Sequence, residues 1–150
     1  MTNVRIRKAS LEDVQKLVEF NQAMALETEG KSLDSTTLTA GVETLIKRPE
    51  YGFYLVAEQN NSIAAGLLVT YEWSDWRNSL FWWIQSVYVT PEYRRQGLYS
   101  SLYQRVQEMA NAEDNVCGFR LYVEKENTKA QQTYQALGMS ECEYFMYQSN

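Results

Sequence analysis

The sequence contains no histidine in its 150 residues. This absence excludes Ser-His-Asp and Cys-His nucleophile systems, a histidine general base and nearly every catalytic zinc geometry, so we expect no bound metal. Cysteine is scarce as well, because only Cys117 and Cys142 occur, far apart and without the spacing of a metal or redox motif. We expect both to be small buried side chains in a reducing compartment.

Long apolar runs and an excess of positive charge are also missing. No stretch reaches the roughly eighteen apolar residues of a membrane span, and residues 1–5 lack a signal-peptide apolar region, so we expect a cytoplasmic protein with no membrane partner. Fourteen Lys and Arg against nineteen Asp and Glu give a net charge of −5. This sign disfavours a general phosphate-backbone binder, so nucleic acid is not an expected partner and cationic substrates become more plausible.

The remaining composition is that of a globular chain with a buried core. Hydrophobic residues make up 45% of the sequence and charged residues 22%, both close to the globular average. A chain of 150 residues is long enough for one compact domain and hardly long enough for two. No repeat or low-complexity segment interrupts it, so we expect a single domain over residues 1–150.

The hydrophobic pattern predicts an α+β fold in which two helices come early and strands and helices alternate later. Asn60-Asn61 supplies the turn of a predicted hairpin. The predicted strands cover residues 4–7, 51–59, 62–71, 80–89, 119–123 and 143–147. The predicted helices cover residues 10–27, residues 35–47, about fifteen residues from Leu98, and residues 128–137.

Residues 90–97, Thr-Pro-Glu-Tyr-Arg-Arg-Gln-Gly, join a predicted strand to a helix N-terminus, which is the order of elements that can hold an anion. The first turn of a helix leaves N–H groups without intrahelical partners, and Gly97 lets the backbone approach a phosphate closely. Arg94 and Arg95 add charged donors. The same residues also fit a solvated loop with a turn glycine, and the Walker and Rossmann glycine patterns are absent. The segment alone therefore leaves both interpretations open.

Two motifs favour the anion site. Residues 87–102 read Val-Tyr-Val-Thr-Pro-Glu-Tyr-Arg-Arg-Gln-Gly-Leu-Tyr-Ser-Ser-Leu, and residues 127–139 read Asn-Thr-Lys-Ala-Gln-Gln-Thr-Tyr-Gln-Ala-Leu-Gly-Met. They resemble the acetyl-CoA-binding motif and the second signature of the GNAT N-acetyltransferases, and the order of elements agrees over residues 4–147. The resemblance implies a three-layer fold with helices on both faces of a mixed, mostly antiparallel sheet, two splayed parallel strands in its middle, and acetyl-CoA as cosubstrate.

The resemblance also implies a set of site residues. The pantetheine arm would pair with the backbone of the splayed strand that ends at Val89, and the pyrophosphate would lie on the amides of the following helix start. Tyr134 would act as general acid to the CoA thiolate. Tyr99 stands where the family usually has Gly or Ala, so its ring must point away from the phosphates. The implied cofactor-binding residues are Val87, Tyr88, Val89, Arg94, Arg95, Gln96, Gly97, Leu98, Tyr99, Ser100 and Asn127.

No residue of the acceptor side is identified as the general base. Gln85 stands where many relatives carry a glutamate base, and an amide cannot accept a proton at physiological pH. A water chain past Gln85 and Ser86 is one alternative, and the others are the carboxylates Glu27, Glu29, Glu72, Asp75 and Glu124. Aromatic walls with carboxylates at the rim would suit a cation. The expected acceptor-site residues are Glu27, Glu29, Trp73 and Gln85.

The expected function is transfer of acetyl from acetyl-CoA to a primary amine of a small molecule. We expect direct attack in a ternary complex, because the chain has no nucleophile with a histidine partner. One alternative is a noncatalytic acyl-CoA sensor that has lost its base at Gln85, and another is acetylation of protein N-termini or lysines in an open groove. The resemblance further implies a homodimer, with the aromatic last strand as an interface.

Overall fold

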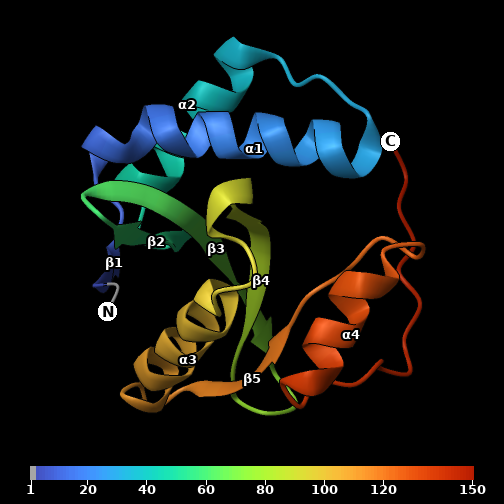
Figure 1. Cartoon of the computed structure of the whole chain (residues 1–150). Coiled ribbons are helices and arrows are strands. Elements are labelled where there is room, and N and C mark those ends of the chain that lie inside the picture. Colours follow the sequence, from blue (N-terminus) through green and yellow to red (C-terminus); the bar gives the residue numbers. More distant parts are fainter. Residues whose placement is uncertain (1–2) are drawn as a thin grey trace.

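The computed structural model describes residues 3–150, which form one five-stranded sheet with helices on both faces (Figure 1). The strand order is β1-β2-β3-β4-β5. Neighbouring strands are antiparallel from β1 to β4, and β5 joins β4 in parallel. The predicted mixed and mostly antiparallel sheet is therefore confirmed. The strands are β1 (Val4–Lys8), β2 (Gly52–Gln59), β3 (Ser62–Ser74), β4 (Ser79–Val89) and β5 (Val116–Arg120).

Four helices accompany the sheet, all at positions that the sequence predicts. Helices α1 (Val14–Glu29) and α2 (Ser35–Lys47) cover one face, and α3 (Leu98–Asn111) covers the other (Figure 1). Helix α4 (Thr128–Ala136) follows β5. Short 3-10 turns precede α1, at Leu11–Asp13, and follow β4, at Pro91–Tyr93.

Strand β2 divides the core between the two helical layers. Its side chains alternate, so Tyr54 and Val56 pack toward α1 and α2 while Leu55 and Ala57 pack toward α3. Nearly every residue of this strand is buried, as expected of a strand that is covered on both faces. The hairpin with β3 turns at Asn60 and Asn61, whose φ values of 54° and 61° are the left-handed conformation that Asn tolerates well.

An ion pair joins the start of α1 to the sheet. The Asp13 carboxylate accepts hydrogen bonds from the Arg7 guanidinium at 2.8 and 3.0 Å and from the Ser10 backbone N–H at 2.7 Å. Arg7 of β1 also pairs with Glu58 of β2. Asp13 is 4% exposed, and the Arg7 hydrogen bonds hold the pKa of its carboxyl below the ordinary value. This network fixes the helix entry on the first two strands.

The structure corrects the predicted last strand. Residues 143–147 form no strand, so β5 is an edge strand and the β4–β5 pair lies at the side of the sheet instead of its middle. The predicted strand over residues 119–123 is observed earlier, at Val116–Arg120. A strand needs a neighbour for its backbone groups, and alternation of side chains in residues 143–147 supplies none.

The prediction that both cysteines are buried is also wrong. Cys117 and Cys142 are free and exposed. Cys117 lies on β5, which has a neighbouring strand on one side only, and Cys142 lies in the C-terminal segment after α4. Neither position has a second layer to cover it.

Helix lengths and polarity bear on membrane association. Within residues 3–150, no helix is both long enough and apolar enough to cross a bilayer.

Candidate active site

Strands β4 and β5 separate partway along their length. Their parallel pairing begins at Leu80 with Val116 and ends at Trp83 with Arg120, whereas β4 continues to Val89. The β5-facing edge of residues 84–89 therefore has no strand beside it in the described chain. Free backbone N–H and C=O groups on such an edge can pair with an extended ligand as an added strand would.

A β-bulge bends β4 within this open stretch. Tyr88 pairs with Gly66 of β3 and Gln85 pairs with Leu68, so β4 carries one more residue than its partner between these pairs. Ser86, inside the bulge, has a φ of 53°. The extra residue makes Tyr88 face α1, while Val87 packs against the core on the α3 side. Bulges of this kind redirect side chains next to functional sites.

The start of α3 lies at the same end of β4. Arg95 and Gly97 have φ values of 64° and 78°, which turn the loop sharply into the helix. The first intrahelical bond runs from the Ser101 N–H to the Gly97 carbonyl at 3.0 Å. The amides of residues 98–100 consequently have no carbonyl of the preceding turn to bind, which makes this helix start suitable for an anion. A Cβ on Gly97 would meet no atom within 4 Å, so the backbone there is open to an approaching ligand.

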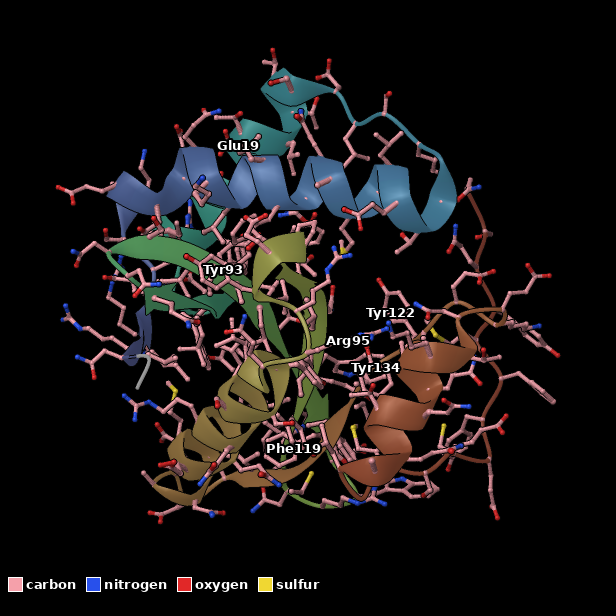
Figure 2. The ribbon with its side chains drawn as sticks, in the orientation of Figure 1. Glu19, Tyr93, Arg95, Phe119, Tyr122 and Tyr134 are labelled. Carbon is pink, nitrogen blue, oxygen red and sulfur yellow. The ribbon has the colours of Figure 1, made fainter. Side chains whose placement is uncertain are left out.

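The two arginines of the loop differ in their contacts. The Arg94 guanidinium donates to the Val89 carbonyl at 2.9 Å and to Glu27 at 2.8 Å, and it lies 5.3 Å from the centre of the Tyr88 ring. Arg95 is exposed and makes no hydrogen bond or ion pair with another described residue. Figure 2 shows it on the side of the loop that faces α4. Of the two guanidinium groups, that of Arg95 is therefore the one available to a ligand.

The side chain of Gln96 anchors the same loop to β2. Its carbonyl oxygen accepts from the Gln59 amide at 3.3 Å, and its own amide donates to the Glu92 carbonyl at 3.3 Å. The cofactor contacts predicted for Gln96 are thus left mainly to its backbone.

Glu27 joins residues that the sequence assigns to two different subsites. Its carboxylate accepts from the Tyr88 hydroxyl and from Arg94, and these hydrogen bonds lower the pKa of Glu27. The cluster ties the C-terminal end of α1 to β4 and its following loop. Glu29 lies outside the cluster, because its exposed carboxylate pairs with Lys31 at 3.4 Å.

Tyr134 faces the site from α4. Asn127 caps this helix by accepting from the Ala130 N–H at 3.2 Å. Figure 2 shows Tyr134 and Tyr122 on the same side of the molecule as Arg95. The phenol is half-buried, and burial raises its pKa, so it is protonated at neutral pH.

Tyr99 contacts Tyr134 across the space between α3 and α4. The two rings meet edge to face, with centroids 5.7 Å apart and an angle of 65°. On its other side the Tyr99 ring stacks on Tyr103 at 6.3 Å. Its hydroxyl is buried and has no hydrogen-bond partner in the described chain, and burial raises its pKa. Tyr99 is therefore the side chain through which α3 holds the ring of Tyr134.

Gln85 belongs to a row of side chains on the α1 face of the sheet. Its amide donates to the Thr70 hydroxyl at 2.8 Å. Further along the same face, Glu72 accepts from the Trp83 indole at 2.7 Å and from Arg120 at 2.9 and 3.2 Å. Both carboxylates near β4, Glu27 and Glu72, therefore have cationic partners.

Trp73 is not brought together with the other predicted acceptor residues. It pairs with Leu80, which packs on the α3 side of the sheet, whereas Gln85 lies on the α1 side. Trp82 and Trp83 face opposite sides of the sheet, because Trp82 is buried in the core on the α3 side and Trp83 contacts Glu72 and Tyr122.

Sequence reasoning missed the residues of β5 and its extension that line this face. Arg120 and Tyr122 come beside Glu72 and Trp83 only through the parallel register of β4 with β5. Parallel register is set by tertiary packing, so no local motif marks it. Thr70 could have been found, because the hairpin register places it opposite Trp83 and diagonal to Gln85.

The described chain holds no recognisable metal centre. In residues 3–150, no group of three or more Cys, Asp or Glu side chains is arranged to bind a metal ion.

Several solved structures have the same fold. A possible acetyltransferase from Clostridium difficile 630 is 45% identical, with a TM-score of 0.92 and coverage of 98% of this chain and 97% of that one. A predicted acetyltransferase from Clostridium acetobutylicum, solved with acetyl-CoA, is 18% identical, with a TM-score of 0.80 and coverage of 98% and 96%. The aminoglycoside N-acetyltransferase AAC(6')-Iy, in complex with CoA, is 16% identical, with a TM-score of 0.78 and coverage of 100% and 96%.

The sequence itself matches a known family. No curated protein matches the sequence of this chain. Residues 16–139, which include β4, the helix start at α3 and the Asn127–Tyr134 motif, match the Acetyltransferase (GNAT) family. Together with the splayed strands and the 45% identical relative, this match establishes that the chain belongs to the GNAT family of acetyltransferases.

Proposed function

We propose that this protein transfers an acetyl group from acetyl-CoA to a primary amine of a small molecule, by direct attack in a ternary complex. The observation that carries the proposal is the separation of β4 from β5 after Trp83, next to the helix start at Leu98. This arrangement offers an open backbone edge and unpaired helix amides side by side. An extended, polyanionic cosubstrate needs both.

The residues around the open edge fit acetyl-CoA. The backbone of Val87 and Tyr88 would pair with the pantetheine arm, and the amides of residues 98–100 would bind the pyrophosphate. Arg95 would supply the free guanidinium, while Arg94 would hold the loop through Glu27 and Val89. When bound, acetyl-CoA supplies an activated thioester that an amine can attack directly.

Tyr134 would donate a hydrogen bond to the departing sulfur. As the amine nitrogen bonds to the acetyl carbon, the carbon–sulfur bond breaks and negative charge develops on sulfur. The phenol is neutral at physiological pH, because the ordinary tyrosine pKa of about 10 is already above that of a thiol, about 8.5, and burial raises it further. Complete proton transfer from such a phenol is uphill, so Tyr134 would act first as a hydrogen-bond donor to the thiolate. Asn127 fixes the helix that carries it.

The proton of the amine would leave by water. Glu27 and Glu72 both accept from an arginine and from an aromatic donor, so neither offers a free carboxylate to the amine. Gln85 cannot take the proton, although it can orient a water with its unused carbonyl oxygen, since its amide is held by Thr70. A relay past Gln85 and Ser86 therefore remains the simplest route.

The acceptor would lie on the α1 face of the sheet. Trp83 and Tyr122, with ring centroids 6.2 Å apart, offer aromatic surface next to Gln85, and Glu27 lies at the end of α1. Aromatic faces stabilise an ammonium group. The aminoglycoside N-acetyltransferase shares the fold and is named for a small-molecule amine acceptor, which is compatible with this class.

Thiol release from acetyl-CoA across a panel of small amines, with a lysine peptide included, tests the proposal. We expect turnover with at least one small amine and a fall in kcat of about 100-fold in Tyr134→Phe, the lower end for loss of a general acid. Tyr51→Phe is the matched control, because Tyr51 is an exposed tyrosine before β2 and its variant should keep full activity. Unchanged kcat in Tyr134→Phe would contradict the assigned role.

The second candidate is a sensor that binds acyl-CoA without turnover. Gln85 favours it, because the β4 position that faces the acceptor side carries no titratable base. Tight binding of acetyl-CoA with no thiol release on any member of the panel would establish the sensor and reject the enzyme.

A further inference from the structure

The α1 face of the sheet carries a guanidinium that is held in place but only partly used. Arg120 of β5 donates through one nitrogen, Nη1, to both carboxylate oxygens of Glu72, at 2.9 and 3.2 Å. Its Cζ atom lies 3.7 Å from the centre of the Phe81 ring, which fixes the plane of the group. The Nε and Nη2 atoms of Arg120 make no hydrogen bond with another described residue. These two nitrogens form an edge that can bind a carboxylate through two parallel hydrogen bonds.

Positive charge exceeds negative charge around the Phe81 ring. Arg77 of the β3–β4 connection lies 5.0 Å from the centre of the same ring, and its side chain has no ion pair within the described chain. Glu72 is the one carboxylate among the described residues that pairs with either arginine, and it also accepts from the Trp83 indole at 2.7 Å. The chain as a whole has a net charge of −5. This part of its surface nevertheless favours an anionic group over a second ammonium group.

The Arg120 side chain lies at the closed end of the gap between β4 and β5. Arg120 pairs with Trp83, and this is the last pair before the two strands separate. Gln85 follows Trp83 by two residues on the same face, which corresponds to about 7 Å along a strand. Trp83 and Tyr122 therefore offer aromatic surface between Gln85 and the guanidinium. A ligand that spans this distance meets a polar group at each end and aromatic rings in its middle.

We propose that the acceptor is an amine with a carboxylate at the far end of a short apolar linker, and that Arg120 binds this carboxylate through Nε and Nη2. The inference rests on the proposed function and narrows its acceptor class. The amine would lie at Gln85 and the linker on Trp83 and Tyr122. Glu72 is a positioning residue, because it orients the guanidinium through Nη1. An α-amino acid is too short to reach both ends through its α-amine, because one carbon atom separates that amine from its carboxylate.

Acceptors of equal length and different charge test the inference on the unmodified protein. The matched set is δ-aminovalerate, its amide and the diamine cadaverine. We expect kcat/KM for δ-aminovalerate to exceed that for each of the others by about tenfold, because only its carboxylate can form a charge-assisted pair with Arg120. Equal or higher kcat/KM for the amide or the diamine would overturn the inference. It would leave the proposed function intact, since acetyl transfer to an amine would still take place.

Binding separates failure of this inference from failure of the proposed function. Calorimetric titration of the CoA-loaded protein with the same three compounds needs no turnover. If none of them is acetylated but δ-aminovalerate binds about tenfold more tightly than cadaverine, the carboxylate site stands and the proposed reaction fails for this class. Equal affinity for the three compounds, or no binding of δ-aminovalerate, would overturn the inference whatever the kinetics show.

Substitutions at Arg120 distinguish recognition from a merely structural role. Arg120→Gln removes the guanidinium and releases Glu72, so KM for δ-aminovalerate should rise about tenfold with kcat within about twofold, and the preference should shift toward cadaverine. Arg120→Lys keeps the charge without the two-donor edge, so its KM should be intermediate. Arg5→Gln, at an exposed arginine of the opposite edge strand β1, is the matched control and should change no KM. Equal changes for all three acceptors in Arg120→Gln, or no change, would show that Arg120 does not recognise the carboxylate.

Discussion

The two ends of the chain are packed very differently. Every buried residue of the described structure lies at or before Ala110, and none lies in residues 111–150. In the first region, β2 and β3 are enclosed between α1 and α2 on one face and α3 on the other. In the second region, β5, α4 and the C-terminal segment have a single covering layer at most. The fold therefore owes most of its stability to the first region.

The candidate site spans the boundary between these regions. The open edge of β4, the helix start at Leu98 and Glu27 belong to the first, whereas Tyr134 and Asn127 belong to the second. A well-buried half, to which we assign cosubstrate binding, thus faces a more exposed half, which carries the proposed hydrogen-bond donor Tyr134. We expect a ligand that touches both halves to stabilise the second one most.

The largest expected effect is on the free energy of unfolding, and it compares the packing of the two regions directly. Leu102 is 0% exposed in α3, so Leu102→Ala should lower the free energy of unfolding by about 3 kcal/mol. Leu137 follows α4 and is half-buried, so Leu137→Ala should lower it by about 1 kcal/mol. Urea unfolding of both variants gives the two numbers. Equal losses would mean that the second region is as well packed as the first.

The next effect concerns the Asp13 network of the first region. Arg7 lowers the pKa of Asp13. The stability that the ionised Asp13 network gives to the fold is therefore complete above the ordinary pKa of 3.8, and it is lost as the pH falls toward the lower folded value. Asp13→Asn should cost about 2 kcal/mol at neutral pH, the value of a hydrogen bond to a charged group, and the cost should shrink in acid. Urea unfolding at several pH values checks this. Glu141→Gln, at an exposed carboxylate of the second region, should change nothing at any pH.

The same division explains which features the sequence could predict. The periodicity of α1 and the continuous apolar run of β2 are local signals. Both elements form as predicted, because helices cover the sheet on both faces there. The last strand is also a local signal, yet residues 143–147 lack a neighbouring strand and Cys117 lacks a covering layer. Local pattern predicts that a segment can be a strand, and only tertiary structure decides whether it has a partner.

The site was predictable to a similar degree. The loop, Gly97 and the helix start follow from a motif contiguous in sequence, and the structure has the predicted strand, turn and helix there. The engagement of Arg94 by Glu27 joins residues far apart in sequence, as does the contact between Arg120 and Glu72. Such pairs depend on how α1 and β5 lie on the sheet, which no motif encodes.

The third prediction concerns the contact that joins the two regions. Tyr99 holds the Tyr134 ring edge to face, so Tyr99→Leu should lower kcat roughly tenfold by loosening the acid, while the affinity for acetyl-CoA stays within about twofold. Tyr99→Phe keeps the ring and removes a buried hydroxyl that has no partner in the described chain, so it should keep kcat and unfold no more easily. Steady-state kinetics with direct binding measurements separates the two variants. A loss of kcat in Tyr99→Phe would instead assign the role to the hydroxyl.

The smallest effect distinguishes the two arginines of the loop at the boundary. Arg95 is free to meet the pyrophosphate, so Arg95→Ala should weaken binding of CoA about fivefold, as expected for one charge-assisted hydrogen bond at an exposed site, and less at high salt. Arg94 is committed to Glu27 and the Val89 carbonyl in a pair that is about 40% exposed on each side, so Arg94→Ala should cost no more than about 0.5 kcal/mol of stability. The salt dependence of CoA binding by the Arg94→Ala variant should match that of the unchanged protein. Calorimetric titration of CoA at two salt concentrations checks both variants. A salt-dependent loss of CoA affinity in Arg94→Ala alone would show that Arg94 leaves Glu27 to bind the phosphates.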